Sequence, residues 1–202
     1  MADTKVSALT AASYCDGTEE FPIAVGGASK KSTISQAIAG AFCKLQADYT
    51  LTSQTAAQKL FNASTNGAVT LPLGTYRFEC FVAITGLSAT SGNGAFSLAG
   101  TAVIAKQLMV GVGIDATTLS TAAAFGGAVV QAASAFTTNT VTAATGTSVG
   151  FIVSGTFDVT TAGTVIPSIA LVTAAAGVVK AGSYFRVKRL AANGVATLGN
   201  WS

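Results

Sequence analysis

The clearest pattern along the chain is an alternation of apolar and polar positions that begins after residue 50. In the segment 76–84 every second position is apolar, and Arg77 and Glu79 stand between them. A period of two places alternate side chains on opposite faces of a β-strand. Three further segments show the same alternation: 107–114, 151–159 and 184–188. In the first of these the apolar set is Leu108, Val110, Val112 and Ile114.

Glycine-containing turn signals separate these segments. Asn66-Gly67, Leu73-Gly74 and Asn193-Gly194 are examples, and no helical pattern lies between them. Many short strands with such turns and no intervening helices indicate a mainly β domain. We therefore expect an antiparallel jelly-roll β-sandwich over residues 49–202.

The first quarter of the chain differs from the rest. Residues 1–49 hold four of the 11 basic residues and five of the eight acidic ones. Residues 1–20 contain few large apolar side chains, so we expect them to lie extended along another protein or subunit. Residues 21–25 are predicted to form a short strand, and Gly26-Gly27 a turn. An N-terminal arm of residues 1–48 is the expected first unit.

One helix is predicted in this arm, over residues 34–46. Thr33 can act as its N-cap, with Gln36 three residues later as the second member of a capping box. Apolar residues then recur at intervals of three and four, which places them on one helical face. These residues are Ile34, Ile38, Phe42 and Leu45.

The composition is strongly apolar for a chain without membrane spans. Hydrophobic residues make up 50% of the chain and charged residues 9%, against roughly 25% charged in ordinary soluble domains. Mean hydropathy is +0.57, yet no run of 18 apolar residues occurs, so we expect no transmembrane helix. The first residues also lack the apolar core of a signal peptide. The low charge favours an extensive interface between subunits.

The residues needed for most catalytic and metal sites are missing. The chain has no histidine, which argues against the usual nucleophile triads and zinc sites. After residue 50 the carboxylates are Glu79, Asp115 and Asp158, without calcium-site spacing. A glycosidase built on a carboxylate pair remains an alternative, although solvated surface groups are the favoured interpretation. We expect no enzymatic activity, no cofactor and no metal.

Three cysteines, Cys15, Cys43 and Cys80, are odd in number and form no CxxC motif. They are interpreted as buried, reduced thiols. Two glycine motifs also fail as phosphate sites. Residues 111–116 match the G-x-G-x-x-A pattern, but no helical stripe follows, so a strand end is favoured. In residues 26–32, Lys30 occupies the glycine that a Walker A loop requires.

Lys180, Arg186, Lys188 and Arg189 form the one basic cluster near the C-terminus. Nucleic-acid binding would require more positive charges together with exposed aromatic residues. A solvated strand or an intersubunit contact is therefore favoured, and we expect no direct nucleic-acid or membrane partner.

Residues 5–38 resemble an N-terminal segment common in tailed-bacteriophage virion proteins. The shared elements are Val6-Ser7-Ala8-Leu9, Gly17-Thr18-Glu19-Glu20-Phe21-Pro22, Gly26-Gly27, Lys30-Lys31 and Thr33-Ile34-Ser35-Gln36. Thr10 and Ala24 depart from the usual Pro or Val. In such proteins the segment precedes a fibre, knob or decoration domain and mounts it on the virion. The resemblance thus implies virion docking through Phe21, Ile23, Lys30, Lys31, Ile34, Ile38, Phe42 and Leu45.

Two later segments resemble jelly-roll knobs of the tumour-necrosis-factor and C1q type. Residues 71–84 are similar to a Gly-x-Tyr-x-Phe strand of these knobs, and residues 182–190 with the terminal 198–202 resemble closing strands of phage knobs. Such knobs are typically trimers. The resemblance implies a homotrimer on the virion, bound to the major capsid protein or to other virion proteins.

We expect a capsid decoration (cement) protein on the outer surface of the capsid, because a compact knob without a fibrous shaft fits between capsomers. The rival within this class is a tail-fibre knob that recognises a host-surface glycan through exposed aromatic residues such as Trp201 or Tyr184. A free lectin or a glycan-active enzyme is the rival outside the class.

Overall fold

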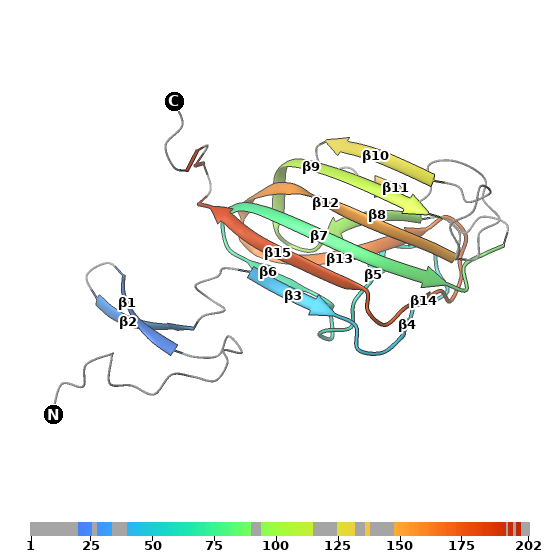
Figure 1. Cartoon of the computed structure of the whole chain (residues 1–202), viewed down its shortest axis with the longest axis horizontal. Helices are drawn as coiled ribbons and strands as arrows, with labels where there is room; N and C mark the ends of the chain where they lie inside the picture. Colours follow the sequence, from blue (N-terminus) through green and yellow to red (C-terminus); the bar gives the residue numbers. More distant parts are fainter. Residues whose placement is uncertain are drawn as a thin grey trace. The chain divides into compact units, whose positions relative to one another are not determined.

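All regular structure in the described part of the chain is β-strand. A computed structural model (Figure 1) describes residues 20–25, 28–33, 40–89, 94–114, 125–131, 136–137 and 148–198 without 193 and 196. The contacts of the chain divide it into two units, Met1–Gly40 and Ala41–Ser202. This division falls after Gly40, whereas the sequence predicts it after residue 48.

The first unit contains an antiparallel pair of strands, β1 (Glu20–Val25) and β2 (Ala28–Thr33). The predicted strand at residues 21–25 is confirmed. The predicted turn at Gly26-Gly27 lies outside the described residues. Lys30 and Lys31 belong to β2, where Lys30 is the Cα partner of Ile23.

The strands from Gly40 onward form two antiparallel sheets. In chain order the described strands are β3 (Gly40–Lys44), β4 (Tyr49–Thr50), β5 (Gln58–Lys59), β6 (Val69–Leu71), β7 (Gly74–Thr85), β8 (Gly94–Ala99), β9 (Val103–Ile114), β10 (Phe125–Gln131), β11 (Phe136–Thr137), β12 (Ser148–Thr161), β13 (Gly163–Leu171), β14 (Val178–Val179) and β15 (Tyr184–Ala191). The larger sheet has eight strands in the order β10-β9-β12-β7-β14-β4, and β15 pairs with both β7 and β3. The smaller has five, in the order β11-β8-β13-β5, with β6 also paired to β13.

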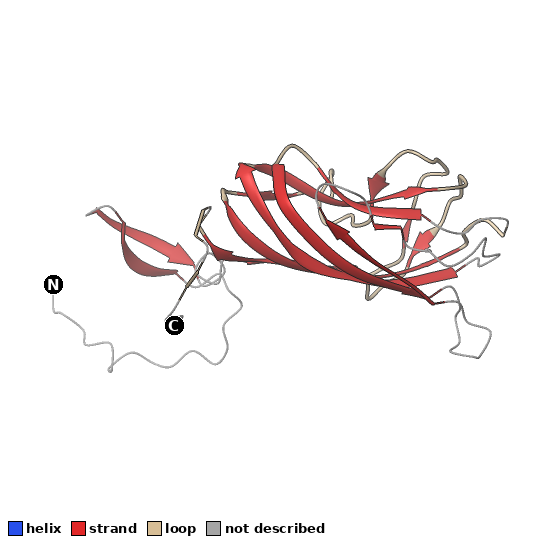
Figure 2. Ribbon diagram, turned by 90° about the horizontal axis from the view of Figure 1, so that it is seen from above, coloured by secondary structure: helices blue, strands red, loops and turns tan. Residues whose placement is uncertain are grey.

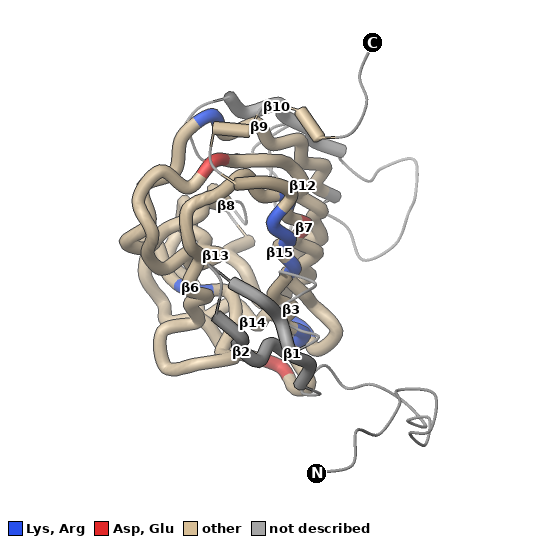
Figure 3. Tube along the Cα trace, turned by 90° about the vertical axis from the view of Figure 1, so that its left-hand side faces the viewer, with Lys and Arg blue, Asp and Glu red and all other residues tan. Residues whose placement is uncertain are grey.

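The two sheets form a sandwich with jelly-roll connectivity. Figure 2 shows the strands of this unit from above, and Figure 3 shows β6, β13 and β8 in one layer beside β3, β15, β7, β12 and β9 in the other. For this comparison the short strands β4 and β14 are left out, and β5 and β6 count as one strand. In chain order, strands one to eight are then β3, β5/β6, β7, β8, β11, β12, β13 and β15. The larger sheet then has the order 1-8-3-6 and the smaller one 2-7-4-5. This double Greek-key order is that of a jelly roll, as the sequence predicts. The hairpin of β9 and β10 extends the larger sheet beyond β12.

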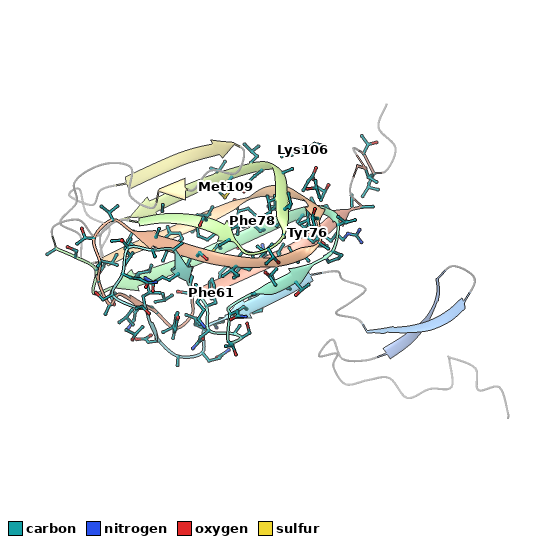
Figure 4. All side chains as sticks on the ribbon, turned by 180° about the vertical axis from the view of Figure 1, so that it is seen from behind. Phe61, Tyr76, Phe78, Lys106 and Met109 are labelled. Atoms are coloured by element: carbon teal, nitrogen blue, oxygen red, sulfur yellow. The ribbon has the colours of Figure 1, made fainter. Side chains whose placement is uncertain are left out.

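Alternate residues of the long strands fill the space between the sheets. On β7 the apolar set of the predicted alternation is fully buried, from Tyr76 to Ile84. Phe78 joins the two layers, because its ring lies 6.4 Å from that of Phe96 on β8 and 5.8 Å from that of Phe157 on β12. Figure 4 labels Phe78 and Met109 among the side chains between the sheets. Cys80 is also buried here, and burial raises the pKa of its free thiol.

The prediction of a helix over residues 34–46 is wrong for residues 40–46, which the structure describes without a helix. Residues 34–39 lie outside the described part. Gly40–Lys44 is strand β3, which pairs with β15. The Leu45 amide donates to the Ser183 carbonyl at 2.9 Å, and the Leu45 carbonyl accepts from the Gly182 amide at 2.9 Å. Pairing with β15 therefore supplies the backbone partners that a helix would have found within itself. For the same reason β3 belongs to the sandwich rather than to the arm.

Candidate functional site

A row of apolar side chains crosses the outer face of the larger sheet. Phe151 and Val153 point into the core, so Ile152 between them points outward. Ile152 is the Cα partner of Phe81 on β7 and of Val112 on β9, and Phe81 is also the partner of Tyr184 on β15. Cross-strand partners share a face of the sheet. Phe42 on β3 joins the row through its ring, 6.1 Å from that of Tyr184.

These five residues, Phe42, Tyr184, Phe81, Ile152 and Val112, are called the outer apolar row. The exposed fraction is 38% for Phe81, 48% for Ile152, 51% for Val112 and 67% for Phe42. Val110 and Leu108 continue the apolar surface along β9, and each is about half exposed. Single exposed apolar residues are normal, whereas a contiguous apolar group that spans five strands is a candidate interaction surface.

The orientation of β9 differs from that of the other long strands. Its apolar alternate positions, Leu108 to Val112, face outward, while Gln107 and Met109 are buried at 4% and 0% exposure. The pairing with β12 fixes this orientation, because Val112 stands opposite Ile152 and Val110 opposite Ser154. The strand therefore turns its more apolar face away from the core of its own chain.

A polar network lies beside the row, on β7 and β15. The Tyr184 hydroxyl donates to one oxygen of the Glu79 carboxylate, and Arg186 donates to the other at 2.8 Å. The bond from Tyr184 and the bond from Arg186 lower the pKa of Glu79. The same bond to Glu79 raises the pKa of the Tyr184 phenol. The network holds Tyr184 in place at the edge of the apolar row.

Positive charges follow on the same two strands. Arg186 stands opposite Glu79, and Lys188 stands directly opposite Arg77. All three cations are exposed. We call Arg77, Lys188 and Arg186 the basic cluster. Figure 3 shows the Lys and Arg positions of β7 and β15 beside one another.

The four basic residues that the sequence grouped together do not all lie on one face of the sheet. Lys180 forms an ion pair with Asp48, which also accepts from the Ala181 amide at 2.8 Å. Arg189 donates to the Leu73 carbonyl at 2.7 Å. Only Arg186 and Lys188 of the four share the outer face of β15, where Arg77 joins them.

A second feature is an apolar pocket of about 200 Å³ beside β3. Phe61 and Phe185 are buried residues of its wall, and Cys43 contributes a half-buried thiol. The other lining residues are Ala41, Phe42, Ala63, Gly67, Ala68, Val69 and Pro167. None of the ten is charged, so the pocket suits an apolar group and offers no acid or base.

The residues predicted to dock on a virion are not gathered on one helical face in the described part of the chain. Phe21 and Ile23 belong to β1, and Lys30 and Lys31 to β2. Ile34 and Ile38 lie outside the described residues. Phe42 is exposed in the outer apolar row. Leu45 is only 3% exposed and packs in the core of its own chain.

The sequence contained a signal for the row that the alternation obscured. Phe151-Ile152-Val153 and Cys80-Phe81-Val82 are continuous apolar triplets inside strands that otherwise alternate. Such a triplet places apolar side chains on both faces of a strand. Trp201, the other aromatic residue singled out for glycan binding, lies outside the described residues.

Among the described residues, no three His, Cys, Asp or Glu side chains come together as a metal site. Within that same part, no helix has the length and apolar character needed to cross a membrane.

Comparison of the chain with protein-family models, with curated proteins and with solved structures finds no match.

Proposed function

We propose that this chain is a structural protein of a bacteriophage virion. In this proposal it is a homotrimer that decorates and cements the capsid, docks through its N-terminal arm and projects the jelly roll. The outer apolar row is the structural observation that supports self-assembly in this proposal. A structural subunit needs a large surface that is covered only in the assembly, and the row is such a surface.

A second copy of the chain is the partner that best suits the row. Its five residues carry no formal charge, in a chain that is only 9% charged. Aromatic residues are enriched in subunit interfaces, where they contribute much of the binding energy. Phe42, Tyr184 and Phe81 supply three such rings, and Ile152 and Val112 supply aliphatic surface beside them. The Glu79–Arg186 pair suits the polar rim of such an interface.

The virion role and the trimeric state rest on the resemblance of residues 5–38 and 71–84 to phage docking segments and trimeric knobs. Two measurements test the proposal separately. Sedimentation of the full chain is expected to give about three times the chain mass of 20.0 kDa. Immunogold labelling of purified virions of the phage that encodes the chain is expected to place gold over the capsid. A stable monomer contradicts the trimer, and virions without gold contradict the virion role.

A tail-fibre or receptor-binding knob is the second candidate, and three neighbouring rings favour it: Phe42 and Phe81 are exposed, and Tyr184 between them is half-buried. The ring centres of Phe42 and Phe81 lie 6.1 and 6.0 Å from that of Tyr184. Flat aromatic faces in a row are suited to contact with sugar rings of a host-surface glycan. Gold over the tail, together with loss of host adsorption when Tyr184 and Phe81 are replaced by Ser, supports this candidate. Unchanged adsorption contradicts it.

A further inference from the structure

We propose that the basic cluster of Arg77, Lys188 and Arg186 binds a carboxylate-rich surface of a different protein. The first observation is the pairing of like charges. Arg77 and Lys188 are direct Cα partners on β7 and β15, and both side chains are exposed on the outer face. Like charges directly opposite each other destabilise a sheet. A binding partner of opposite charge removes this repulsion.

The one acidic residue within the cluster does not neutralise it. Glu79 already accepts hydrogen bonds on both carboxylate oxygens, from Tyr184 and from Arg186. Thr156, the partner of Arg77 on the other side of β7, is neutral. With three cations and one carboxylate, the cluster keeps a net charge of +2.

A second copy of the β domain offers no free carboxylate among its described side chains. Asp48 is paired with Lys180. Asp158 accepts from the Thr75 hydroxyl at 2.7 Å and lies 3.5 Å from the Lys106 ammonium. Glu79 is held as described above. As far as the described side chains of the β domain go, charge complementarity therefore favours an acidic surface of another polypeptide, whereas the outer apolar row suits a second copy.

The arrangement fits carboxylates better than a nucleic acid. A nucleic-acid backbone is neutralised by many cations along a stripe. Here the three cations occupy two adjacent strands, and two of them are arginines, whose guanidinium groups match a carboxylate with two parallel hydrogen bonds. Charges at the rim of an apolar contact steer association and select the partner. If the chain is a virion protein as proposed above, the acidic surface belongs to the protein on which it is mounted.

Immobilised poly-L-glutamate is a direct probe of the cluster in the full chain. We expect the wild-type chain to bind it, with affinity that falls as salt is raised, because exposed charges are screened. The double variant Arg77→Gln/Lys188→Gln is expected to bind about ten-fold more weakly or worse. Lys59→Gln is the control for loss of a cation outside the basic cluster, because Lys59 belongs to β5 of the smaller sheet. It is expected to bind as the wild type does.

Three outcomes overturn the proposal. The first is equal binding of poly-L-glutamate by the double variant and the wild type. The second is tighter binding of duplex DNA than of poly-L-glutamate at equal charge concentration, which assigns the cluster to a nucleic acid. The third is a sedimentation mass that changes in the double variant but not in Lys59→Gln, which assigns the cluster to contact with a second copy. Thermal unfolding of each variant verifies its fold, and virion labelling tests the assembly role independently of these results.

Discussion

Tyr184 on β15 donates its phenolic hydrogen to the carboxylate of Glu79 on β7, at the point where the outer apolar row meets the basic cluster. The bond holds an aromatic ring of the row and a carboxylate of the polar network in one arrangement. Arg186 completes the network from the next outward position of β15. The contribution of the Glu79 carboxylate can therefore be measured through the free energy of unfolding of the chain.

The Glu79 carboxylate is expected to stabilise the fold only above acidic pH. Its pKa in the folded chain lies below the ordinary value of 4.5, so its contribution is fully present above that value. The contribution is lost as pH falls through the lowered folded pKa. Glu79→Gln should lower the free energy of unfolding by about 0.5–1 kcal/mol at pH 7, because the group is partly exposed. Denaturant unfolding of both chains at pH 7, 5 and 3 tests this, and a difference that is constant with pH contradicts it.

Polar substitution in the outer apolar row is expected to weaken self-association. Phe81→Ser/Ile152→Ser removes two neighbouring apolar side chains, each of which contributes up to about 1.5–3 kcal/mol when fully buried. Sedimentation should shift toward the single-chain mass of 20.0 kDa. Val172→Ser is the control, because Val172 is 58% exposed but lies after β13, outside the row. An unchanged mass for the double variant shows that the row is not the interface between copies.

Leu45 and Phe42 are expected to respond differently to truncation. Leu45→Ala should lower the free energy of unfolding by about 2–5 kcal/mol, because Leu45 is buried in the core. Phe42→Ala should change the stability of the dissociated chain by about 0.5 kcal/mol or less, because its side chain is mostly exposed. Denaturant unfolding of the two variants under dissociating conditions makes the comparison. Equal losses are the result expected of a shared helical face and contradict the strand arrangement.

The start of the autonomous β domain is expected to lie at residue 41 rather than at residue 49. A chain of residues 41–202 keeps most of β3, the buried Leu45 and the ion pair of Asp48 with Lys180. A chain of residues 49–202 loses all three and exposes the edge of β15. We expect the first to unfold cooperatively on heating and the second to melt at a lower temperature or to aggregate. Equal melting temperatures would show that β3 contributes little to the sandwich.

The sequence by itself determined the class of fold and the inward faces of three strands. In β7, β12 and β15, buried apolar residues such as Phe78, Phe151 and Phe185 recur at every second position, and most positions between them are small, polar or charged. A strand has only two faces, so a strong alternation leaves one way to bury the large side chains. The lack of a helical crossover pattern between the segments favours antiparallel pairing.

The tertiary structure decided the conformation and orientation of segments whose local sequence pattern allowed two arrangements. Residues 40–44 fit a helical period as well as a strand, and the vacant edge of β15 selected the strand. β9 has small or apolar residues on both faces, and its register with β12 selected which face became exposed. The outer apolar row exists because the sheet brings Phe42, Tyr184, Phe81, Ile152 and Val112 together from five strands. Sequence periodicity records which side of a strand a residue occupies, but only pairing between distant strands decides which residues become neighbours.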